Sequence, residues 1–239
     1  VNKSKTKFTF LSPQRQGLEK GMDIIWKAIP MCKSDFEVLQ VNWFDQRNAE
    51  EKEIVREFLE KKPPQIKLIP LIKREDMPRY YAFADAILGQ MRVGRNGGIE
   101  REAVFCGRPV IHYSNSNITY LIDGHEMVAP YLPHSNDPEE LAKVIDRVVQ
   151  ERGFREKLFE EESEFVDKIS NPHKVAAEWD NLFETVHSRF KIIERNTPHF
   201  KIEILNLISK MAERLLYEKR WKNKKAPVLQ SNDFPKTIK

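Results

Sequence analysis

Short apolar runs alternate with longer amphipathic stretches over the first 150 residues of the chain. The short runs are typical of buried strands, whereas the longer stretches repeat apolar residues at helical spacing. We predict strands at residues 7–11, 36–41, 66–72 and 86–89 and from residue 110 onward. We predict helices at residues 18–29, 47–61, 99–106, 138–149, 151–169 and 172–190, with a short helix opening at 74–78. This alternation predicts an α/β fold, a Rossmann-like doubly wound parallel sheet.

Glycines cluster in the middle of this pattern. Five of the nine glycines lie between Gly89 and Gly107, where a strand leads through a loop into a helix. Such a loop leaves unpaired N–H groups at the positive end of the helix dipole, which suits a phosphate or diphosphate. We expect these N–H groups from Gly97, Gly98 and Ile99. On the glycines alone, an ordinary turn is an equally good interpretation, because a loose glycine cluster is weak evidence for a phosphate site.

The segment that follows the loop carries a family resemblance. From Glu102 to Ile111 the chain reads EAVFCGRPVI. This resembles the E-A-x-x-C/A-G-x-P-V-I/V segment of retaining GT-B glycosyltransferases of family 4, also called group 1. The resemblance covers residues 7–190. It implies the C-terminal, nucleotide-sugar-binding domain of such an enzyme, one half of a GT-B fold.

The resemblance also implies roles for individual residues. Glu102 would contact the ribose of the sugar nucleotide. The family has an arginine five residues before a Lys-Gly pair, which is the spacing of Arg15 from Lys20 here, and these two cations would hold the donor diphosphate. Cations at the end of a strand stabilise the charge of a departing diphosphate, so we expect these two to be catalytic. The alternative interpretation is two exposed cations near a helix start.

Further donor contacts are implied around these residues. Leu71 and Ile72, at the end of the third predicted strand, would lie over the nucleobase, although ordinary strand-end residues would look the same. Asn96 or Glu100 would face the donor sugar, and Glu100 also fits a simple helix-start acid. The family has a second glutamate eight residues before Glu102, where this chain has Gly94. That departure removes a hydrogen-bond acceptor from the expected sugar site.

These features predict the donor-binding half of a retaining, metal-independent glycosyltransferase that uses a UDP- or GDP-sugar. The acceptor side would come from another domain or a partner polypeptide, since 239 residues are too few for two such domains. We expect no cofactor beyond the donor substrate, and the six scattered histidines offer no metal-ligand spacing. Three alternatives stay open: a noncatalytic or degenerate nucleotide-sugar-binding domain, a sugar-nucleotide epimerase on a similar fold, and an adaptor acting through a basic tail.

Charge divides the chain into two parts. From His187 to the end there are 13 Lys and Arg against 5 Asp and Glu, a net charge of +8, which leaves −4 for the preceding residues. We therefore predict a domain at 1–190 and an amphipathic basic helix with a disordered tail at 191–239. Docking of this helix on protein is the favoured interpretation, and contact of 200–225 with an anionic membrane is the second. We expect no nucleic-acid partner, and a cytoplasmic location or one at the inner membrane face.

Overall fold

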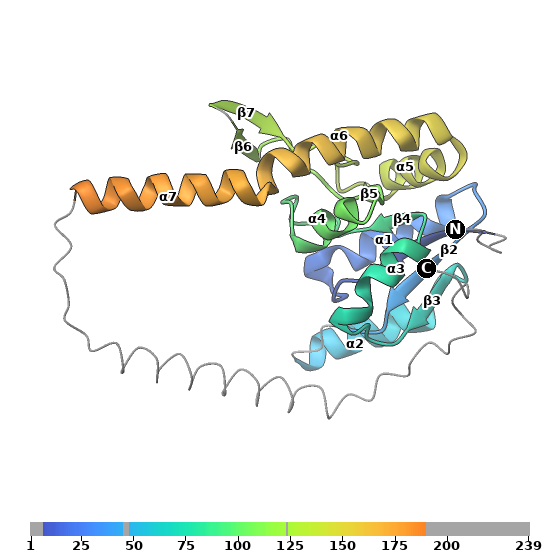
Figure 1. Cartoon of the computed structure of the whole chain (residues 1–239). Coiled ribbons are helices and arrows are strands. Elements are labelled where there is room, and N and C mark those ends of the chain that lie inside the picture. The colour runs from blue at the N-terminus through green and yellow to red at the C-terminus, as the bar shows by residue number, and fades with distance from the viewer. Residues whose placement is uncertain (1–6, 45–47, 123, 190–239) are drawn as a thin grey trace. The chain divides into compact units, whose positions relative to one another are not determined.

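A computed structural model describes residues 7–44, 48–122 and 124–189 (Figure 1). The described residues up to Asn171 belong to one compact unit. Helix α7 (Pro172–Arg189) belongs to a second unit and is described by itself. The expected domain boundary at 190, the basic helix and the 200–225 segment lie outside the described residues. Within the described part, no helix has the length and apolar character needed to cross a membrane.

The first unit is built on a five-stranded sheet in which every neighbouring pair is parallel. The strand order is β3-β2-β1-β4-β5, so the order reverses between β1 and β4. In open α/β sheets, ligands bind at the carboxyl ends of the strands beside such a reversal. The strands are β1 (Phe8–Ser12), β2 (Phe36–Val41), β3 (Ile66–Ile69), β4 (Ala86–Leu88) and β5 (Val110–Ile111). The predicted doubly wound parallel sheet is therefore confirmed.

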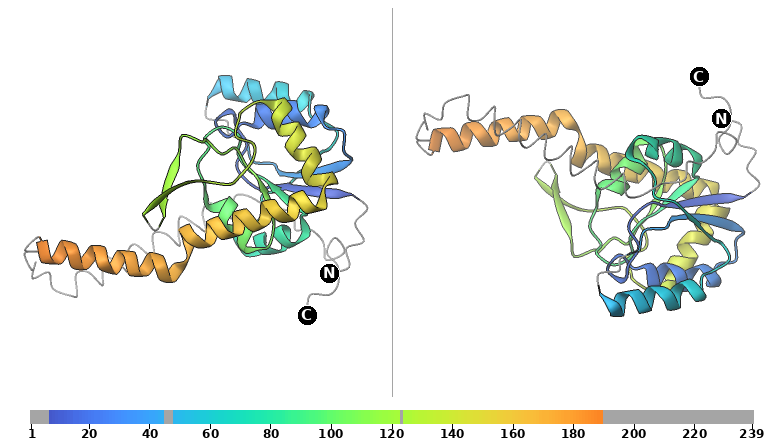
Figure 2. Two further views of the ribbon diagram at one scale, coloured as in Figure 1. Left: turned by 90° about the horizontal axis from the view of Figure 1, so that it is seen from above. Right: turned by 90° about the horizontal axis from the view of Figure 1, so that it is seen from below.

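Helices cover both faces of the sheet (Figure 2). Helices α1 (Met22–Ala28) and α2 (Ala49–Glu60) lie on one face, and α3 (Met77–Phe83) and α4 (Gly98–Phe105) lie on the other. Helix α5 (Pro138–Gln150) packs on α1, and α6 (Arg152–Ser170) packs on both α4 and α5. This two-sided cover explains why the central strands are buried on both faces instead of alternating between buried and exposed residues. The fully buried side chains of β1 and β4 include Phe10, Leu11, Ile87 and Leu88.

The predicted start of the first helix is wrong. Instead of a continuous helix from residue 18, the chain makes a 3-10 turn, η1 (Leu18–Lys20), and α1 begins only after Gly21. Gly21 has a left-handed backbone with φ of 74°. A Cβ at this position would lie 2.9 Å from the Cβ of Met91 and 3.0 Å from its carbonyl carbon. Only glycine fits here, because the backbone lies so close to the loop after β4. Its left-handed conformation separates η1 from α1.

Two other elements differ from the sequence-based expectation. Strand β3 ends at Ile69, before Pro70, which has no N–H to donate to a neighbouring strand. Leu71 and Ile72 therefore lie in the loop that leads to the 3-10 turn η3 (Arg74–Asp76). An antiparallel hairpin of β6 (Thr119–Ile122) and β7 (His125–Val128), which the sequence analysis did not predict, follows β5.

Candidate functional site

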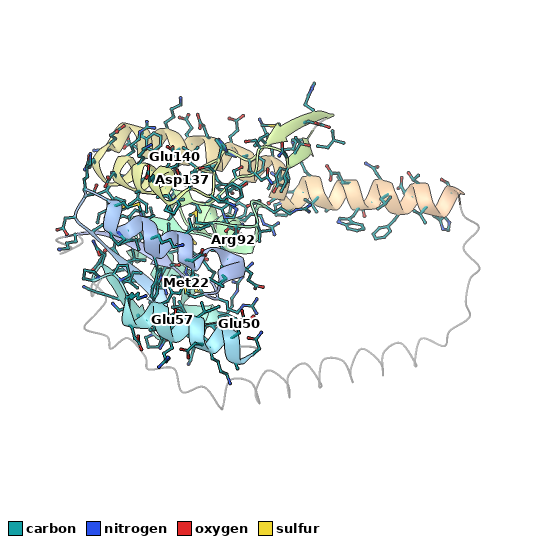
Figure 3. The ribbon with its side chains drawn as sticks, turned by 180° about the vertical axis from the view of Figure 1, so that it is seen from behind. Met22, Glu50, Glu57, Arg92, Asp137 and Glu140 are labelled. Carbon is teal, nitrogen blue, oxygen red and sulfur yellow. The ribbon has the colours of Figure 1, made fainter. Side chains whose placement is uncertain are left out.

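The loops that follow β1 and β4 are joined at the point where the strand order reverses. The backbone N–H of Met91 donates to the carbonyl of Lys20 at 2.9 Å. The Nε of Arg92 donates to the carbonyl of Leu18 at 2.7 Å, and its guanidinium reaches both carboxylate oxygens of Asp23 at 2.8 and 2.9 Å. Figure 3 labels Arg92 together with Met22, the first residue of α1. One arginine thus ties the loop after β4 to the loop after β1 and to the first turn of α1. The loop that holds Lys20 and the loop that leads to the glycine segment are therefore in contact.

The two predicted catalytic cations lie on the first of these loops. Arg15 forms an ion pair with Glu19, and its side chain is 37% exposed. Lys20 is half-buried, and its carbonyl carries the contact to the loop after β4. Arg15 and Lys20 therefore both lie on the segment that follows β1. Their contact with a diphosphate stays a prediction.

The glycine loop offers fewer N–H groups than expected. The N–H of Gly97 donates to Oε2 of Glu100 at 2.9 Å, so it already has an acceptor and the expectation that it serves a ligand needs correction. Gly98, which is exposed, and Ile99, which is half-buried, form the first turn of α4. The first-turn N–H groups of an α-helix have no partner within the helix. Gly98 and Ile99 are thus the predicted N–H donors that fit an anion at this helix start.

Glu100 points into the molecule instead of toward an open site. It is 4% exposed, and its Oε1 lies 2.8 Å from Nδ1 of His112, which is itself 1% exposed. Burial alone would raise the pKa of this carboxyl, but the contact with His112 and the N–H of Gly97 outweigh burial and lower the pKa. Glu100 is therefore an ionised cap of α4. This differs from the expected contact with a donor sugar, because both oxygens are engaged inside the fold.

Glu102, in α4, lies in a second polar cluster with Arg74 of η3 and Tyr81 of α3. Its two carboxylate oxygens accept from Arg74 at 2.8 and 2.5 Å, and the hydroxyl of Tyr81 donates to it at 3.3 Å. Burial, followed by the charge of Glu102, raises the pKa of Tyr81, so this hydroxyl keeps its proton. Arg74 is the first residue of η3, which follows the loop that holds Leu71, half-buried, and Ile72, 8% exposed. Glu102 is therefore bonded to the residue that follows the loop expected to hold the base, and its contact with a ribose stays a prediction.

Arg74 and Arg92 were not identified from the sequence. Each makes a two-oxygen contact with a carboxylate on a distant part of the chain, which is a geometry that arginine favours. No local pattern signals such a pair, because the partners are separated by 28 residues for Arg74–Glu102 and by 69 for Arg92–Asp23.

Gly94 stands where the resemblance expects a glutamate, and the fold leaves no room for a side chain there. Its backbone is left-handed, with φ of 71°. A Cβ would lie 2.6 Å from the Cβ of Asn115, 2.9 Å from the ring of Tyr113 and 3.0 Å from the N–H nitrogen of Asn115. The missing carboxylate therefore reflects a close contact between two loops at the same edge of the sheet.

A small hollow of about 190 Å³ lies beside the loop after β1, between the start of α1 and α2. It is lined mainly by apolar side chains, with two glutamates among them. Its lining residues are Gly17, Leu18, Glu19, Met22, Glu51, Ile54 and Val55. Across the described ranges, no three His, Cys, Asp or Glu side chains gather as a metal site.

Comparison with known proteins identifies the family. The family model described as "Glycosyl transferases group 1" matches residues 1–164. This chain belongs to that family, and the resemblance noted in its sequence is confirmed. A comparison with curated proteins finds no match.

Solved structures share the fold at low sequence identity. HepE from Anabaena, solved with UDP and glucose, is 16% identical with a TM-score of 0.55, over 73% of this chain and 48% of that one. Sucrose-phosphate synthase from Thermosynechococcus elongatus is 19% identical with a TM-score of 0.60, over 77% and 47%. The C-terminal domain of the group 1 protein LpcC from Francisella tularensis is 16% identical with a TM-score of 0.51, over 69% and 86%. This chain thus spans about half of the first two proteins but most of an isolated C-terminal domain.

Proposed function

We propose that this chain is the donor-binding half of a retaining, metal-independent glycosyltransferase that takes a nucleotide-diphosphate sugar. The diphosphate would lie between Arg15 and Lys20 on one side and the first-turn N–H groups of Gly98 and Ile99 on the other. Glu102 would hold the ribose beside Leu71 and Ile72. The acceptor would be bound by a second domain or a partner polypeptide.

One observation carries this proposal: the loops after β1 and β4 are bonded to each other where the strand order reverses. Cations and helix-start N–H groups on these loops together suit a leaving diphosphate, because both stabilise charge that develops as the bond to the sugar breaks. Membership of the family agrees with this chemistry. UDP and UDP-glucose, with which HepE was solved, are therefore suitable probes.

Titration calorimetry with UDP and GDP tests the site. We expect Arg15→Ala and Lys20→Ala each to weaken binding of the preferred nucleotide by about 10- to 100-fold, because a hydrogen bond to a charged group contributes about 1.5–3 kcal/mol. Lys157→Ala removes an exposed cation from α6 and is the matched control, expected to bind as the unchanged chain does. Equally tight binding by both loop variants would overturn the diphosphate site.

Arg92→Ala should loosen the connection between the two loops without unfolding the chain, because the bond from Met91 to Lys20 remains. The Arg92–Asp23 ion pair is partly exposed, at 44% and 17% of the two side chains, so its loss should lower the free energy of unfolding by less than about 1 kcal/mol. We nevertheless expect UDP to bind about 3- to 10-fold more weakly, since the loops would have to be ordered at the moment of binding.

Arg152→Ala breaks an exposed arginine–glutamate pair on α6 and serves as the control for Arg92→Ala. Asp23→Asn should reproduce part of the Arg92→Ala effect, because it removes the charge of the other partner. Unchanged UDP affinity in the Arg92 variant would show that the two loops do not need this arginine to form the site.

A noncatalytic nucleotide-binding domain is the second candidate. The closed space around Gly94 and the buried carboxylate of Glu100 favour it, because they leave the glycine loop without an acidic group for the sugar. A product assay with UDP-glucose and a supplied acceptor domain separates the candidates. Tight UDP binding with no transfer would support the noncatalytic domain.

A further inference from the structure

We propose that Tyr120 and Tyr131 are positioning residues that hold the glycine loop in its ligand-binding conformation through Asn96. This inference rests on the proposed function and adds to it two residues outside the loops that would touch the donor. The β6–β7 hairpin, which holds Tyr120, and the segment after it, which holds Tyr131, would then support the glycine loop without touching the diphosphate.

The two tyrosines contact the same loop residue through different groups. The backbone N–H of Asn96 donates to the hydroxyl of Tyr120 at 2.8 Å. The hydroxyl of Tyr131 donates to Oδ1 of Asn96 at 3.1 Å. Both the main chain and the side chain of Asn96 are therefore fixed, from positions 24 and 35 residues further along the chain.

A rigid aromatic cluster supports the two hydroxyls. The ring of Phe165 in α6 packs edge-on against Tyr120 at 5.1 Å and against Tyr131 at 6.1 Å between ring centres. Tyr131 is fully buried and also contacts the ring of His112 at 5.3 Å. Burial is the main cause that raises the pKa of Tyr131, so its hydroxyl stays protonated and able to donate. The hydroxyls are thus anchored to the core of the first unit.

The loop needs such anchors because glycines flank Asn96 closely. Gly94 has a left-handed backbone, and Gly97 precedes the first turn of α4. Glycine has the largest conformational entropy to lose on ordering, so a glycine loop held only by its own backbone would sample many conformations. Contacts that fix the loop before a ligand arrives lower the cost of binding. The tyrosines would thereby set the directions of the N–H groups of Gly98 and Ile99.

Single-atom changes test this role. Tyr120→Phe and Tyr131→Phe remove only the hydroxyls and keep the rings against Phe165. Hydrogen exchange of the amides of residues 94–99 should become about 3- to 10-fold faster in each variant, with exchange of the central strands unchanged. Affinity for UDP should fall about 3- to 10-fold. Affinity for UMP, which lacks the second phosphate, should change less, so the preference for UDP over UMP should shrink.

Tyr80→Phe, which removes the hydroxyl of a buried tyrosine in α3, is the control and should alter neither loop exchange nor the UDP preference. Unchanged loop exchange in both test variants would overturn the proposal, and so would faster exchange with an unchanged UDP preference. If UDP does not bind to the wild-type chain, GDP and GMP replace UDP and UMP, and a chain that binds neither UDP nor GDP would contradict the proposed function instead. The exchange measurement would then still decide whether the tyrosines hold the loop.

Discussion

Replacing Glu100 by alanine is expected to lower the free energy of unfolding by about 1 to 3 kcal/mol, the usual cost of leaving buried polar groups without their partner. The change leaves His112 inside the protein without its carboxylate and leaves the N–H of Gly97 without its acceptor. The pKa of Glu100 is lowered in the folded state, so this contribution should be present at neutral pH and lost as the pH falls through that value. Urea unfolding at pH 7 and at pH 4 measures both effects.

Glu100→Gln separates charge from shape. Its side-chain oxygen can still accept from Gly97, so we expect it to destabilise the chain less than alanine does. Glu139→Ala is the matched control, because Glu139 lies in the first turn of α5 but is exposed. Glu139→Ala should lower the free energy of unfolding by less than about 1 kcal/mol. If Glu100→Ala were as mild as Glu139→Ala, the buried pair would not hold the start of α4.

The parallel sheet could be predicted from the sequence because both faces of its strands are buried. Phe10 and Leu11 in β1, and Ile87 and Leu88 in β4, are adjacent apolar residues that are completely buried. Short apolar runs of this kind, separated by amphipathic stretches, predict a parallel sheet covered by helices. Strand 36–41 matches its prediction at both ends. The start of α1 was missed because it depends on Gly21 meeting Met91, a contact between residues far apart in sequence.

The sequence indicated which loops carry the candidate site but not the hydrogen bonds and ion pairs of its side chains. Arg15 and Lys20 follow the first predicted strand and the glycine loop follows the fourth, and β1 and β4 are neighbours at the point where the strand order reverses. Whether Glu100 faces outward or inward depends on His112, which lies on another segment. The β6–β7 hairpin escaped notice because its β6 alternates exposed and less exposed positions over only four residues.

The second large effect concerns Glu162, whose carboxyl is completely buried in α6. Its Oε2 accepts from the N–H of Val110 in β5 at 2.9 Å, and among the described residues Oε1 has no hydrogen-bond partner. Burial raises the pKa of Glu162 well above its ordinary value, and the N–H of Val110 only partly opposes this. The folded chain therefore holds a proton that the unfolded chain releases near pH 4.5. Its contribution to stability is complete below that pH and is lost as the pH rises toward the folded pKa.

Glu162→Gln removes this titration while its amide oxygen can still accept from Val110. Below about pH 4.5 the variant should be slightly less stable than the unchanged chain, because the amide brings one more donor into the interior without an acceptor. Each pH unit above that should favour the variant by up to about 1.4 kcal/mol, until the folded chain also loses its proton. Urea unfolding between pH 4 and pH 8 should therefore show the two stabilities crossing. Parallel curves would mean that Glu162 is ionised in the folded protein, and β5 would then be joined to α6 by a buried charge instead of a neutral acid.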